Sequence, residues 1–145
     1  MRKWTAFAGF VLAVTLTACS SSSAASYEDS AVVRAQEGLA AVGTLHQIIR
    51  AHTEGRLFPT FTTAAVDDVL ATATGALDTL ESEQPTGPQT RQIYDELHPQ
   101  LQVAVARAGE AQEALEAGDV GRITATDAQL VRVSDELSLF VESHQ

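Results

Sequence analysis

The sequence predicts an all-α protein folded as an up-down-up-down four-helix bundle, and three observations carry this prediction. Apolar residues recur at steps of three and four in four separate segments, which is the spacing of one face of an α-helix. Glycine and proline interrupt the pattern at three places, and each interruption is short. No segment of the sequence shows the alternation typical of a half-buried strand. Amphipathic helices joined by short connections favour antiparallel neighbours in a bundle.

An export signal is predicted ahead of the bundle, over residues 1–18. The chain opens with the basic stretch Met1-Arg2-Lys3, and residues 5–16 carry no charge. This matches the apolar region of an export signal, which takes roughly 7–15 residues. It is too short to span a bilayer, which takes about 20 residues. The segment ends in Leu16-Thr17-Ala18-Cys19, which holds the only cysteine of the chain.

These four residues resemble the lipobox of bacterial lipoproteins, with leucine three positions before a cysteine and small residues between them. In that family the cysteine receives a diacylglycerol and a peptidase cuts just before it. The resemblance therefore implies lipid on Cys19 and a mature protein anchored outside the cytoplasm to the cell membrane or an outer membrane. It covers residues 1–19 alone. The alternative is an incidental thiol, in a cleaved peptide or in an uncleaved anchor.

A flexible tether is expected over residues 19–26, because residues 20–26 are serine and alanine only. Such a segment has too little apolar surface to offset the entropy of ordering it. A frayed first helical turn is the alternative for this stretch. The folded domain is then expected over residues 27–145, a length that suits one domain.

The first helix is predicted from about Tyr27 to Glu54, and the second from about Thr62 to Gln84. Gly55 suits the left-handed position that ends a helix, and Pro59 breaks the helical period. The inner face of the first helix is expected to hold Val32, Leu39, Val42, His46 and Ile49, widened by Ala35, Ala40, Gly43 and Leu45. The inner face of the second is expected to hold Val66, Val69, Ala73, Ala76 or Leu77, and Leu80.

The third helix is predicted from about Gln89 to Ala117, and the fourth from Asp119 or Thr124 to about Ser143. Pro99 is expected to kink the third helix or to split it in two. The inner face of the third helix is expected to hold Ile93, Leu97, Leu101, Ala104, Ala108, Ala111 and Leu115. That of the fourth is expected to hold Ile123, Leu130, Val133, Leu137, Phe140 and Val141.

The charge of the body excludes some classes of partner. Removal of residues 1–18 leaves seven of the nine basic residues against all 19 acidic ones, a formal net charge of −12. Nucleic acid is disfavoured, since its phosphates must be neutralised by basic side chains. Docking onto an anionic membrane surface by charge is disfavoured for the same reason. The expected membrane attachment is therefore the lipid on Cys19.

Metal or haem binding is the main chemistry that a helical bundle invites, and the sequence supports it poorly. No Glu-x-x-His pair of the di-iron bundles and no Cys-x-x-Cys-His haem motif is present in the sequence. Asp95 and His98 share one helical face, and with His46 they form the best metal-binding alternative. The competing interpretation is a solvated polar face for the first two and a satisfied histidine for His46. No cofactor is expected.

Catalysis is not predicted either. The sequence has no Gly-x-Ser-x-Gly and no glycine-rich phosphate loop, and its cysteine is assigned to the lipid. Glu110, Glu113 and Glu116 recur every third residue, which indicates a solvated stripe.

The most informative remaining feature is the cluster Arg56, Leu57, Phe58 and Phe61. Connectivity places residues 55–61 and 118–121 at a distal tip, away from the tether, with residues 84–88 and the C-terminus toward the membrane. The apolar residues of the cluster either close the end of the core or form an exposed patch that binds a partner. Two functions follow as expectations. The first is a non-catalytic, lipid-anchored interaction or structural module with an envelope protein as partner, and the second is a bundle that binds a metal, haem or small lipid.

Overall fold

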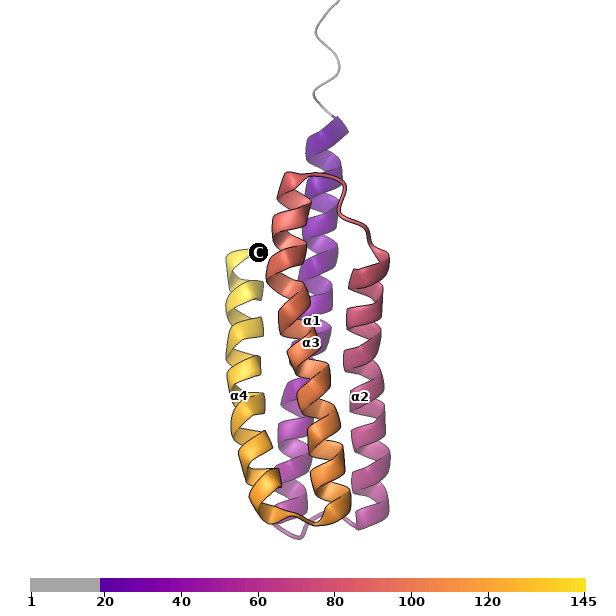
Figure 1. Ribbon diagram of the computed structural model, residues 1–145, viewed down its shortest axis with the longest axis vertical. Coiled ribbons are helices and arrows are strands. Elements are labelled where there is room, and N and C mark those ends of the chain that lie inside the picture. The colour runs from indigo at the N-terminus through magenta and orange to yellow at the C-terminus, as the bar shows by residue number, and fades with distance from the viewer. Residues whose placement is uncertain (1–18) are drawn as a thin grey trace, which may run out of the picture.

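Residues 19–145 form four antiparallel helices, which run as predicted in up-down-up-down order (Figure 1). The computed structural model describes residues 19–145, with side chains from residue 23 onward. The helices are α1 (Cys19–Thr53), α2 (Pro59–Ser82), α3 (Pro88–Ala117) and α4 (Val120–Ser143). No strand occurs within residues 19–145. The all-α four-helix bundle expected from the sequence is therefore confirmed.

The start of α1 differs from the expectation. The helix begins at Cys19 rather than near Tyr27, so the stretch expected to be a flexible tether over residues 19–26 is helical. Alanine is the best helix former and serine costs only about 0.5 kcal/mol relative to it. The stretch extends a helix already held in the bundle, so it bears no nucleation cost of its own. The predicted signal segment, residues 1–18, and the side chain of Cys19 lie outside the described residues.

Local sequence explains where the other helices begin. Pro59 and Pro88 occupy the first turns of α2 and α3, where the missing N–H of proline has no partner to lose. Asp119 caps α4, and its Oδ1 accepts a hydrogen bond from the N–H of Arg122 at 3.0 Å. Of the two starts expected for the fourth helix, Asp119 is thus the correct one.

Two glycines end helices in the left-handed conformation. Gly55, predicted as the end of the first helix, has φ 68°, and Gly118 has φ 63° after α3. Residues with side chains are strained at such angles, whereas glycine is not. Each turn is completed by backbone hydrogen bonds to the preceding helix, such as Arg56 N–H to the carbonyl of Ala51 at 2.8 Å.

Pro99 does not split α3, which is one helix from Pro88 to Ala117. The proline is exposed, and so is Asp95, whose carbonyl loses its helical hydrogen bond to the missing N–H. Because both groups face solvent, water can satisfy that carbonyl and the helix continues.

The cross-section of the bundle is narrowed along one diagonal. Among the described residues, α1 and α3 are in contact across the centre, whereas α2 and α4 are not in contact. Gly38 of α1 permits this approach, because a Cβ atom there would lie 2.6 Å from Cδ2 of Leu101 on α3. Within residues 19–145 alanine is also the commonest residue of the core, with nine buried alanines against six leucines and six valines, and its small side chain allows the helices to approach closely.

The predicted inner faces of α2, α3 and α4 are buried, apart from Leu77 and Leu115, which are partly buried. The face of α1 needs correction: Leu39, Gly43 and His46 are only partly buried and Ala40 is exposed. Because α1 packs against three helices, its buried face is wide. The middle of this face lies toward residues that the predicted inner face did not include. Those residues are Ala31, Gly38, Ala41 and Ile48.

Candidate functional site

The connection between α1 and α2 and that between α3 and α4 both lie at the end of the bundle opposite the start of α1 (Figure 1). We call residues 54–61 and 118–121, which form this end, the distal tip. The arrangement expected from connectivity is therefore correct. The connection between α2 and α3, together with the C-terminus, lies toward the other end.

The chain geometry at the distal tip turns one apolar residue inward and leaves two outside. Leu57 is partly buried and packs against the core. Phe58 has extended backbone angles, φ −74° and ψ 146°, as expected for a residue before proline. Its side chain is 74% exposed, and that of Phe61 in the first turn of α2 is 66% exposed. Of the apolar residues Leu57, Phe58 and Phe61, only Leu57 therefore closes the end of the core, which was one of the two roles expected for them.

The second connection adds an apolar residue that sequence reasoning missed. Val120, the first residue of α4, is 70% exposed. An apolar residue directly after Gly118-Asp119, in a connection of two residues, was the available signal. The distal tip therefore presents Phe58, Phe61 and Val120 to solvent from two connections. Phe58 and Phe61 lie three residues apart at the start of α2, and exposed apolar patches tend to mark interaction sites.

Arg56 in the distal tip and Arg122 next to it are already paired. The guanidinium of Arg56 contacts the carboxylate of Glu54 at 2.5 Å, and that of Arg122 contacts Glu113 at 3.1 Å. Arg56, predicted as a contact residue, is 64% exposed but has its charge compensated within the tip. Its positive charge therefore contributes little to attracting an acidic partner.

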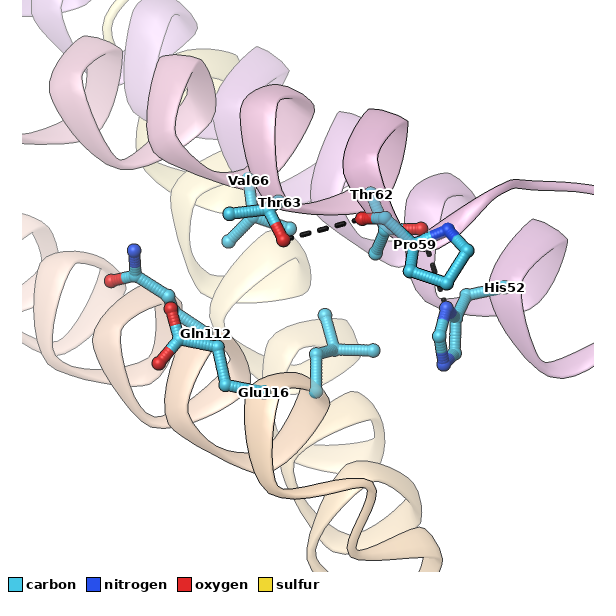
Figure 2. Close-up of a pocket in the computed structure, with 8 residues that line it drawn as sticks. His52, Pro59, Thr62, Thr63, Val66, Gln112 and Glu116 are labelled. Atoms are coloured by element: carbon cyan, nitrogen blue, oxygen red, sulfur yellow. Dashed lines mark hydrogen bonds between the residues drawn. The ribbon is translucent and has the colours of Figure 1, made fainter.

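A groove of about 250 Å³ opens beside the distal tip, between α2 and α3 (Figure 2). The end of α1 contributes His52 to it. We call it the distal groove, and its lining residues are His52, Pro59, Thr62, Thr63, Val66, Gln112, Leu115 and Glu116. Val66 is buried and Leu115 partly buried, so these two form an apolar floor. Sequence reasoning missed this groove, since its residues come from three helices and share no motif.

Hydrogen bonds engage most polar groups of the distal groove. The Thr62 hydroxyl donates to the carbonyl of Phe58 at 3.3 Å, so it accepts from Nδ1–H of His52, also at 3.3 Å. The Thr63 hydroxyl donates to the carbonyl of Pro59 at 3.2 Å. These contacts fix the α2 side of the groove.

The α3 side carries the charge. Gln112 Nε2 donates to Oδ1 of Asp67 at 2.5 Å and so bridges α3 to α2. Glu116 lines the groove, but its carboxylate has no hydrogen bond or ion pair with any described residue. The carboxylate stripe expected over Glu110, Glu113 and Glu116 is therefore divided, because the first two are paired with arginines. The groove can bind a positively charged group, and it holds one acid that has no partner of its own.

The four histidines lie at contacts between neighbouring helices, one for each side of the bundle. His46 of α1 donates from Nδ1 to Oδ1 of Asp127 on α4 at 2.6 Å. His98 of α3 contacts Glu81 of α2 at 2.8 Å and stacks on Tyr94. The two remaining contacts are His52 with Thr62 between α1 and α2, and His144 with Glu96 between α4 and α3.

The metal-binding alternative required His46, Asp95 and His98 to meet, and the structure does not bring them together. His46 is engaged at the contact of α1 with α4, and His98 at that of α2 with α3. Within residues 19–145 no group of three histidine, cysteine, aspartate or glutamate residues is placed to hold a metal ion. The histidine–carboxylate pairs join helices instead.

Comparison of the chain with protein-family models, with curated proteins and with solved structures finds no match. In the part of the chain that the structure describes, no helix is both long and apolar enough to cross a bilayer.

Proposed function

We propose that the protein is a non-catalytic interaction module of a bacterial envelope, anchored by lipid on Cys19 and binding a protein partner through its distal tip. The observation that carries the proposal is the exposure of Phe58, Phe61 and Val120 at the end of the bundle opposite the start of α1. A lipid at residue 19 would hold the protein at one end and leave this apolar tip free at the other.

The distance between the two ends supports this arrangement. From Cys19 to Thr53, α1 has 35 residues, which corresponds to about 50 Å at 1.5 Å per residue. A rigid helix of this length holds the distal tip well clear of the membrane headgroups. The helical start of α1 strengthens the argument, because a stalk that is helical from residue 19 sets the reach of the tip more narrowly than a flexible tether.

Partner capture by wild-type and variant protein tests the proposal. The full-length chain is produced with its own signal, cross-linked in envelope membranes, and its partners are identified by mass spectrometry. Replacing Phe58 and Phe61 together by serine is expected to abolish capture of the partner. Because both side chains are exposed, the free energy of unfolding should change by less than about 0.5 kcal/mol per residue. Lost capture would then reflect lost contact rather than unfolding.

Leu139 offers a matched control. It is 65% exposed on α4, near the opposite end of the bundle. Leu139→Ser removes one exposed apolar side chain without touching the distal tip, so capture should persist. Equal capture by the Phe58/Phe61 variant and the wild type would contradict the proposal.

The anchor is tested separately by the mass of the protein recovered from the membrane fraction. The expected product begins at Cys19 and carries acyl groups, and Cys19→Ala should release the protein from the membrane. Two or three acyl chains give firm attachment, at about 0.8 kcal/mol per buried CH₂. A product that begins elsewhere, or whose thiol is free, would refute the anchor but leave the distal tip to be judged by capture.

A further inference from the structure

We propose that the distal groove receives a lysine or arginine side chain from a basic, partly apolar segment of the protein partner. This inference rests on the proposed function, because it identifies the chemistry of the partner that the distal tip binds. The groove lies directly beside the tip, and Pro59, which lines it, follows the exposed Phe58 in the chain.

The groove matches the two-part chemistry of a long basic side chain. Lysine and arginine carry an apolar stem and a charged head, and they lay the stem on apolar surface while the head stays hydrated. Val66 and Leu115 offer the apolar surface at the floor. Glu116 lies on the α3 wall, with Thr63 on the α2 wall opposite (Figure 2).

The charge of the groove is not compensated from within the protein. Glu116 has no ion pair among the described residues, and Asp67 accepts its hydrogen bond from the neutral amide of Gln112. The neighbouring arginines are occupied, Arg56 by Glu54 and Arg122 by Glu113. An incoming cation would therefore not have to displace an existing ion pair.

The same charges argue against a second copy of this chain as the occupant. Residues 19–145 contain no lysine and have seven arginines against 19 acids, so two copies repel each other. A partner segment that combines basic and apolar side chains meets both the acidic groove and the apolar tip. We therefore assign the complementary partner to the basic class.

Binding of designed peptides to the full-length chain in non-ionic detergent tests this assignment, with fluorescence anisotropy as the measurement. The probe is a labelled 12-residue peptide of alternating lysine and leucine. A second peptide has glutamate in place of every lysine, and a third has serine in place of every leucine. The lysine–leucine peptide is expected to bind, more weakly as salt is added. The other two should bind much less or not at all.

Two carboxylate variants separate the groove from the general acidity of the protein. Glu116→Gln should weaken binding of the lysine–leucine peptide about two- to fivefold, which is the range of an exposed ion pair. Glu136→Gln removes one exposed charge from α4, which contributes no residue to the lining of the groove, and should leave the affinity unchanged. Equal effects of the two substitutions would overturn the assignment.

Other results also decide the question. Binding of the glutamate peptide as tightly as the lysine peptide would show that charge plays no part, and would overturn the proposal. Free lysine amide that competes as well as the peptide would make the groove a small-amine site rather than a partner site. If these tests fail while capture still depends on Phe58 and Phe61, the groove assignment is wrong and the proposed function stands.

Discussion

Substitution of Gly38 by alanine probes the close approach of α1 and α3. The new Cβ would lie 2.6 Å from Cδ2 of Leu101, whereas carbon atoms in contact prefer about 3.5–4.0 Å. Leu101 is fully buried, so a retreat of about 1 Å must be absorbed by the packed core. Overpacking of this kind costs about 1–3 kcal/mol. Alanine improves helix propensity by about 1 kcal/mol over glycine. The expected net loss of stability is therefore about 0–2 kcal/mol.

Gly75→Ala is the matched comparison, because Gly75 lies inside α2 and a Cβ there would meet no atom within 4 Å. It should gain about 1 kcal/mol from propensity alone. The difference between the two variants, about 1–3 kcal/mol, isolates the steric cost. Urea unfolding measures both values. Far-UV circular dichroism is the signal rather than tryptophan fluorescence, because the one tryptophan of the sequence, Trp4, lies in the predicted signal segment. If Gly38→Ala stabilises the protein as much as Gly75→Ala, the packing argument fails.

Three further predictions concern single residues of the bundle. Asp119→Ala removes the side-chain cap of α4 and should cost about 0.5–2 kcal/mol in urea unfolding, whereas Asp119→Asn should retain most of the stability. Pro99→Ala restores a backbone N–H inside α3 and should raise the unfolding free energy by up to about 3 kcal/mol. A loss of stability would contradict the interpretation that Pro99 destabilises α3 without breaking it. Burial, and then the charge of Glu83, raises the pKa of Tyr27 above 10.0, so the stability from this group is present below pH 10 and is lost as the pH rises through the raised value. With Tyr94, the other tyrosine, replaced by phenylalanine, absorbance titration should therefore show one phenolate transition with its pKa above 10, and a transition at or below pH 10 would refute the assignment.

The fold was open to prediction because helical periodicity and chain breakers are local signals. The inner faces of α2, α3 and α4, the left-handed Gly55 and the cap at Asp119 each follow from residues close together in the sequence. The start of α1 was not predictable in the same way. The serine and alanine residues before Tyr27 are compatible with either a flexible tether or a helix. Because they are attached to a helix that is already formed, the helix is favoured.

The candidate site was predictable only in part. The sequence indicated the position of Phe58 and Phe61 at the distal tip but left open whether they close the core. Their side chains are exposed because Leu57 takes the inward position. The distal groove gave no sequence signal, since His52, Val66 and Glu116 come from three helices and become neighbours only on packing.

The sequence by itself determined the number of helices, their order and most of their apolar faces, because these depend on spacing within one segment. Tertiary structure alone decided which diagonal of the bundle is short, which histidines pair with which carboxylates, and which apolar residues stay outside. The physical reason is that these properties depend on how side chains from different helices share space. Gly38 matters because Leu101 of α3 faces it, and which carboxylates Arg56 and Arg122 pair with is set by how the helices pack.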